Sequence, residues 1–159
     1  MVNPEQLHIC GMISCGENVK FDSNVIIEGN VKLEYVVLVG ANSILKDFTI
    51  GEITTNNSFS LVETAVIGEN WIIGPYGRVR KDVSIGNYVS IDNFVEVKNA
   101  NIASKWRINH LSFIGDVDLE EQVIIGAGTI TCNHDEVGIN HTIIEEGCTL
   151  FLAMSRWHL

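Results

Sequence analysis

Aliphatic residues recur at every sixth position along most of the chain. The most regular run is Ile67, Ile73, Val79, Ile85, Ile91 and Val97, and the register continues in both directions with occasional five-residue steps. A second aliphatic column lies four residues after the first, at positions such as Val83, Val89 and Val95. This period is neither the 2 of a half-buried strand nor the 3.6 of an amphipathic helix.

A short strand and a corner in every six residues are typical of a parallel β-helix built from hexapeptide repeats. Glycine often follows the first aliphatic residue, as in Ile85-Gly86, and we expect the tight corner at that glycine. Three hexads close one coil in this class, so about twenty hexads predict roughly seven coils with strands about 4.8 Å apart. We therefore predict an all-β fold, a parallel β-helix of hexapeptide repeats.

The repeat lapses at two places. The polar segment between Thr131 and Thr142 lacks it, and we expect a loop near residues 133–141 to project from one edge of the coil. Such loops often have functional roles. The second lapse covers residues 151–159, which have no glycine corner and form a divergent tail. The prediction is one β-helical domain over residues 1–150, with this tail after it.

Composition narrows the possible functions. The chain has 159 residues, 46% of them hydrophobic, and a formal net charge of −10. Such a chain can bury a core, and its acidity argues against nucleic-acid or anionic-membrane binding. No apolar run reaches 18 residues and no basic segment precedes an apolar block near Met1, so we expect a cytoplasmic protein. The four cysteines form no C-x-x-C pair, and we expect reduced, mostly buried thiols.

Cations gather in one part of this acidic chain. Six of the ten lysines and arginines fall between positions 78 and 107. Arg80 and Lys98 each follow a hexad aliphatic and are eighteen residues apart, so they should stack on adjacent coils at one corner. Two neighbouring cations repel each other unless an anion lies between them, which predicts an anionic ligand such as a phosphate. The alternative is a set of scattered, solvated cations on strand faces.

His110 is the candidate general base, because a neutral imidazole can accept a proton from an attacking amine near pH 7. It lies two hexads beyond Val97, on another side of the coil, and is expected to meet Arg80 and Lys98 only across a groove between subunits. A zinc site made by His110, His134 and His141 is the alternative, but their spacing shows no ligand pattern, so no metal is expected.

Several ordered motifs resemble one family. The segments I-G-P-Y-G-R-V-R, N-F-V-E-V-K-N, N-H-L-S-F-I-G-D and I-G-A-G-T-I-T-C-N-H-D are similar to the acetyltransferase domain of the bacterial bifunctional enzyme GlmU, an N-acetylglucosamine-1-phosphate uridyltransferase/glucosamine-1-phosphate acetyltransferase. The similarity runs from near Asn3 through Cys148. It covers only the first part of that domain, and the change after Cys148 resembles a truncated or frame-shifted reading frame.

The resemblance implies a left-handed coil and a homotrimer with active sites between subunits. It implies transfer of acetyl from acetyl-CoA to the 2-amino group of glucosamine 1-phosphate, in UDP-N-acetylglucosamine and cell-wall precursor synthesis. By matching motifs, Arg80 and Lys98 resemble the sugar-phosphate ligands and His110 the general base. The family's acetyl-CoA contacts fall on Ala127, Asn133 and His134. The uridyltransferase domain has no counterpart here, and neither its Mg²⁺ site nor its nucleotide-transfer chemistry is expected in this chain.

Three departures from the family pattern affect the acceptor site. Phe113 stands where the family has a substrate-binding tyrosine, Ile124 where it has an asparagine, and Ile139 where it has a loop lysine. Two alternatives therefore remain beside the acetyltransferase. The first alternative is a catalytically weak or inactive trimeric scaffold. The second is an acyltransferase that uses another amino sugar.

Overall fold

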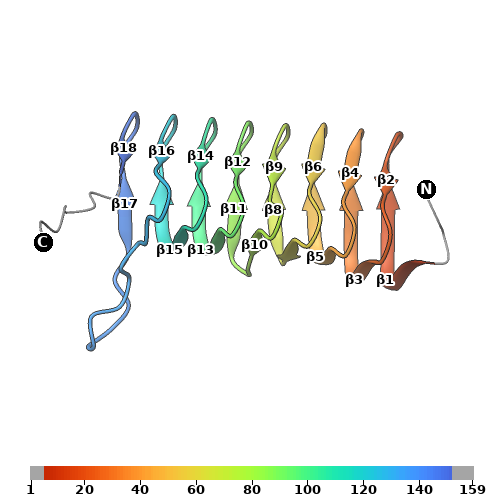
Figure 1. The fold of residues 1–159 in the computed structure, drawn as a ribbon, viewed down its shortest axis with the longest axis horizontal. Coiled ribbons are helices and arrows are strands. Elements are labelled where there is room, and N and C mark those ends of the chain that lie inside the picture. Colours follow the sequence, from red (N-terminus) through yellow and green to blue (C-terminus); the bar gives the residue numbers. More distant parts are fainter. Residues whose placement is uncertain (1–5, 152–159) are drawn as a thin grey trace, which may run out of the picture.

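The computed structural model describes residues 6–151, which form a continuous solenoid of parallel strands, about seven turns long (Figure 1). The divergent tail predicted over residues 151–159 lies outside the described residues except for Phe151. Within the described range no α-helix is present, and no helix there is long and apolar enough to cross a membrane. The parallel β-helix predicted from the six-residue repeat is confirmed.

Each coil runs along three faces in turn, and the third face is an eight-stranded sheet. Its strands are β2 (Lys20–Phe21), β4 (Val37–Val39), β6 (Thr54–Asn56), β9 (Ile72–Ile73), β12 (Ser90–Ile91), β14 (Arg107–Ile108), β16 (Ile124–Ile125) and β18 (Thr149–Leu150).

The ten-stranded sheet covers the first and second faces. Its strands are β1 (Leu7–Cys15), β3 (Val25–Leu33), β5 (Ile44–Ile50), β7 (Leu61–Glu63), β8 (Ala65–Ile67), β10 (Arg78–Val79), β11 (Val83–Ile85), β13 (Glu96–Ile102), β15 (Phe113–Leu119) and β17 (Thr142–Ile144). Long strands such as β5 and β13 turn the corner between the two faces, because β5 pairs with both β7 and β8 and β13 with both β10 and β11.

The two aliphatic columns fill the interior of the coil. Register partners in neighbouring coils are 17 or 18 residues apart, as in Val37 with Thr54 and Ile91 with Ile73. This spacing stacks like side chains on each other, and the hexad aliphatics from Ile27 to Ile125 are buried in one continuous core. Burial of a full side chain of this size contributes about 1.5–3 kcal/mol, so the stack is the main source of stability.

The corners differ from the sequence expectation. A left-handed backbone occurs two or three residues after each hexad aliphatic, and non-glycine residues occupy most of these positions, for example Tyr76, Phe94 and Asp116. The glycine that follows the hexad aliphatic instead allows the backbones of neighbouring coils to approach each other closely. A Cβ at Gly68 would lie 2.8 Å from the backbone of Gly86 in the next coil, which shows why the position needs glycine.

The expectation that the cysteines are mostly buried was wrong. All four, Cys10, Cys15, Cys132 and Cys148, are exposed and free. Cys15 holds an inward position in the hexad register and pairs with the buried Leu33, but it belongs to β1, which has only one strand partner. The hexad register alone therefore does not ensure burial in an end strand: Cys15 is exposed, although Phe21 and Ile144, which also lie in strands with one partner, are buried.

A loop precedes β17 in the last turn of the coil. It leaves the coil between the first and second faces of the last turn and hangs away from the solenoid before β17 (Figure 1). The coil register resumes after it, with Val117 paired to Thr142 and Ile124 to Thr149. The insertion thus takes the place of a corner and leaves the stack unbroken.

Candidate functional site

Arg80 and Lys98 lie on adjacent coils, as the eighteen-residue spacing predicts. Arg80 follows β10, Lys98 lies in β13, and the Arg80 N–H donates to the carbonyl of Val97 at 2.8 Å. Both residues are at the edge where the first face passes to the second. We call this the lysine edge, defined by Arg80, Lys98 and Asp116.

Glu96 balances part of the positive charge near the lysine edge. Its carboxylate lies 2.9 Å from the Arg80 guanidinium and 3.9 Å from that of Arg78. Within residues 6–151 no carboxylate lies within ion-pair distance of the Lys98 ammonium. Sequence reasoning missed this role of Glu96, although its eighteen-residue offset from Arg78 gave the signal. The anion-binding potential of the edge therefore depends most on Lys98.

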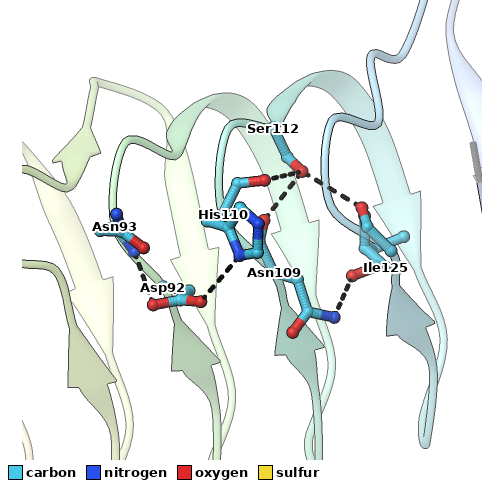
Figure 2. A network of polar contacts seen from close by, with 7 residues as sticks. Asp92, Asn93, Asn109, His110, Ser112 and Ile125 are labelled. Atoms are coloured by element: carbon cyan, nitrogen blue, oxygen red, sulfur yellow. Dashed lines mark hydrogen bonds and ion pairs between the residues drawn. The ribbon is translucent and has the colours of Figure 1, made fainter.

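His110 lies at a different edge, where the third face passes to the first. We call it the histidine edge, defined by Asp92, His110 and Ala127. Figure 2 shows the imidazole next to Asp92, with Nδ1 3.4 Å from Oδ2. The His110 carbonyl accepts a hydrogen bond from the Gly128 N–H at 2.9 Å, which fixes the backbone of the histidine. Both side chains are half-exposed and open to a ligand.

Ser112 and Asn109 hold the turn around His110. The Ser112 hydroxyl lies within hydrogen-bond distance of the carbonyls of Asn109, His110 and Gly126, and the Asn109 amide donates to the Ile125 carbonyl at 2.7 Å (Figure 2). Ser112 is buried, so these contacts are shielded from water. His110 therefore lies in a turn that is held by several hydrogen bonds.

The two edges are separated by the width of the first face. Asn93 stacks beside His110 in the neighbouring coil and is five residues before Lys98. Five residues span at most roughly 16 Å when fully extended, and the left-handed backbone of Phe94 shortens the path here. One copy of the chain therefore does not bring His110 and the Arg80–Lys98 pair together.

The proposed acetyl-CoA residues divide between the two edges. Ala127 is exposed at the histidine edge, one coil beyond His110. Asn133 and His134 are in the projecting loop, and the Asn133 amide donates to a carboxylate oxygen of Asp116 at the lysine edge. His134 is exposed and its Nδ1 accepts from the Glu136 N–H at 3.4 Å.

Asp116 and Asp118 are the charged groups at the base of the loop. Asn99 donates to Asp116 at 2.6 Å, and this bond is the main reason that the pKa of Asp116 lies below its ordinary value. Asn133 and the nearby Lys98 lower the pKa of Asp116 further, against the opposing effect of burial. Asn101 and then His141 lower the pKa of Asp118 in the same way. Both aspartates are therefore held as carboxylates.

The three departures from the family pattern lie on different surfaces. The Phe113 ring packs over Gly115, the register partner of Lys98, so it lines the lysine edge without a hydroxyl. Ile124 is on the outer side of the third face, and Ile139 is exposed in the loop, bridged to His134. Within residues 6–151 no group of three or more histidine, cysteine, aspartate or glutamate side chains could hold a metal ion.

No protein-family model matches the chain. The protein named bifunctional protein GlmU from Nitrosospira multiformis is 47% identical over 146 residues, which are 92% of this chain and 32% of that protein. The GlmU proteins of Azoarcus sp. and Janthinobacterium sp. are 42% and 41% identical and cover the same shares.

This chain is homologous to one part of the GlmU proteins. It spans about a third of the length of these curated relatives. The shared part is the parallel β-solenoid described above.

Proposed function

We propose that the chain transfers acetyl from acetyl-CoA to the 2-amino group of glucosamine 1-phosphate, at sites formed between copies of a homotrimer. The observation that supports this most directly is the division of the site. His110 and Asp92 are at one edge of the first face, and Arg80 and Lys98 are at the other. A neighbouring copy that presents its opposite edge would complete both sets.

The chemistry assigned to His110 follows from its contact with Asp92. An ionised carboxylate only accepts hydrogen bonds, so it selects the tautomer with a proton on Nδ1 and leaves Nε2 free as a base. In the proposed reaction Nε2 takes a proton from the amine as nitrogen attacks the thioester carbon. The C–N bond forms, the C–S bond breaks, and the proton leaves with the CoA thiolate as a thiol.

Lys98 and Arg80 are assigned to the phosphate of the acceptor. Ammonium and guanidinium groups bind phosphate by charge-assisted hydrogen bonds, and the net charge of −10 would otherwise repel it. Ala127, Asn133 and His134 are assigned to acetyl-CoA on the basis of the motifs. We also propose that the protein is cytoplasmic and acts in UDP-N-acetylglucosamine synthesis.

An apolar ladder on the histidine edge supports association of copies. Phe59, Tyr76 and Phe94 stack along three consecutive coils with ring centroids 5.0 and 5.1 Å apart, and each side chain is about half exposed. The exposed Leu111 continues the column beside His110. A contiguous exposed apolar strip of this kind is a feature of protein interfaces. The ladder would bury its rings against a second copy.

The test is release of CoA thiol from acetyl-CoA in the presence of glucosamine 1-phosphate. His110→Ala should lower kcat by about 10²–10⁴-fold, and unchanged activity would remove His110 from the mechanism. Light scattering should give a mass of about three times 17.6 kDa. A stable trimer with no thiol release would instead favour the scaffold without turnover.

A different amino sugar as acceptor is favoured by one observation, the packing of Phe113 on the lysine edge. A ring without a hydroxyl loses one hydrogen bond to a sugar and leaves the pocket less polar. A panel of amino sugar phosphates separates the two cases, because faster thiol release with another acceptor would identify it as the substrate.

A further inference from the structure

The projecting loop is attached to the coil by two parallel hydrogen-bonded ladders. In the first ladder Asn99 and Asn133 both donate to the carboxylate of Asp116. In the second ladder Asn101 donates to Asp118 at 2.7 Å, and His141 Nε2 lies 2.8 Å from the other oxygen of Asp118. Asn133 and His141 are the two ends of the loop, so each end is tied to its own carboxylate.

The carboxylates belong to a rigid strand. Both are in β15, which is paired on one side with β13 and on the other with β17. Asp116 is 5% exposed and has the left-handed backbone of a corner, with a φ of 53°. The Gly115 N–H next to it donates to the Thr131 hydroxyl at 2.8 Å. Asp116 is therefore a fixed point on the coil.

The loop itself has little to hold it in place. Every residue from 134 to 140 is exposed, and Val137 at its tip is 94% exposed. Its internal contacts are local ones, such as the Asn140 N–H to the Asn133 carbonyl at 2.6 Å. A segment with so few buried contacts opens easily, so its position depends on its two ends.

Asp116 also determines which way the Asn133 amide points. Because a carboxylate accepts but does not donate, Asn133 must present its NH₂ group to Asp116, which leaves the amide oxygen as its remaining acceptor. The same carboxylate is close enough to the Lys98 ammonium to be stabilised by its charge. One buried group thus links the loop to the cation of the lysine edge.

We propose that Asp116 and Asp118 are positioning residues that anchor the two ends of the loop and hold Asn133 against Asp116, whose coil is adjacent to that of Lys98. Only the predicted effect on the KM for acetyl-CoA rests on the proposed function, in which the loop contacts acetyl-CoA next to the bound acceptor. The anchoring itself is a property of the fold and is measured without turnover.

Hydrogen–deuterium exchange of the full chain tests the anchoring. Asp116→Asn should raise the exchange rate of the Asn140 amide and its loop neighbours by about tenfold or more, because a hydrogen bond to a charged group is replaced by a weaker one. Asp118→Asn should raise it as well. Asp82→Asn is the matched control, since Asp82 has the same left-handed backbone at the same edge and is not bonded to the loop. Loop exchange equal in Asp116→Asn and wild type would overturn the proposal.

Asn133→Ala gives the same test without changing the coil. It removes the N-terminal anchor from the loop side, and the same rise in exchange is expected even if the Asp116 variant fails to fold. No rise in the folded Asn133→Ala protein would overturn the proposal.

Kinetics then test the link to the site. With wild-type thiol release established, Asp116→Asn should raise the KM for acetyl-CoA by about tenfold with a much smaller change in kcat, while Asp82→Asn leaves both unchanged. A KM that stays at the wild-type value while the loop exchanges faster would overturn the positioning role. Absence of thiol release in the wild type would refute the proposed function, but the exchange measurements would still decide the anchoring.

Discussion

The Arg80 guanidinium lies 2.9 Å from the Glu96 carboxylate of the adjacent coil. The same carboxylate is 3.9 Å from Arg78, so one anion serves two cations. Lys98 has no such partner in the described part of the chain. The basic patch seen in the sequence is therefore partly neutralised, and Lys98 is its most available charge.

Arg80→Gln should raise the half-saturating concentration of glucosamine 1-phosphate by about 10–100-fold, because a charged hydrogen-bond donor is lost and Glu96 is left less compensated. Adding Glu96→Gln to this variant should recover about threefold, since the repelling carboxylate is removed. Steady-state kinetics measure both effects, with Arg107→Gln on the third face as the control. A double variant no better than Arg80→Gln would argue against a repelling role of Glu96.

Asp92→Asn should lower kcat about tenfold with little change in either KM. The amide no longer selects the histidine tautomer that leaves Nε2 free, but the imidazole itself remains. The comparison with His110→Ala, which should be far less active, separates orientation of the base from its loss. Equal kcat in Asp92→Asn and wild type would show that Asp92 does not orient His110.

Asn56→Val should stabilise the fold by about 1–2 kcal/mol. Asn56 is fully buried in the aliphatic column between Val39 and Ile73, and neither its amide nitrogen nor its amide oxygen has a partner. An unpaired buried polar group is costly, so valine at this position relieves the cost. Urea unfolding followed by the fluorescence of the buried Trp71 and Trp106 measures the change.

Asn57→Val is the control for this prediction. Asn57 is the next residue and donates to the Gly74 carbonyl at 3.3 Å, so its replacement should lower the urea midpoint. A lower midpoint in Asn56→Val would contradict the account of the core.

Acid should weaken the fold around Asp116. The folded-state pKa of Asp116 is lowered, first by the hydrogen bond from Asn99, so the unfolded chain binds its proton more readily. The contribution of this carboxylate to stability is then complete above about pH 4 and is lost as the pH falls through the lower folded value. The urea midpoint of the wild type should fall more steeply below pH 4 than that of Asp116→Asn. Parallel pH profiles of the two proteins would refute this assignment.

The repeat made the fold predictable because each hexad repeats the same inward positions. Ile67 to Val97 give the register, and the lapse after Thr131 marks the loop. The ends of the stack were not predictable in this way, since Cys15 follows the register and is nevertheless exposed in a coil with one neighbour. The glycine rule also misplaced the left-handed residues, because asparagine, aspartate and aromatic residues adopt that conformation here.

Contacts in the candidate site were predictable where the two residues are one coil, or about eighteen positions, apart. Arg80 with Lys98 follows from their eighteen-residue offset, and His110 with Asp92 has the same offset. The tie between Asn133 and Asp116 was missed, because the loop breaks the register and spacing no longer reports which residues meet. Contacts between copies depend on surface shape, on which a linear repeat gives no information.

The most direct test mixes two variants, each of which lacks one half of the proposed site. His110→Ala and Lys98→Ala proteins, co-expressed with different tags and purified as mixed assemblies, are assayed for CoA thiol release. If each site takes His110 from one copy and Lys98 from its neighbour, random trimers regain about a quarter of the wild-type activity. Activity in the mixed assemblies no higher than in either parent would contradict a site shared between copies.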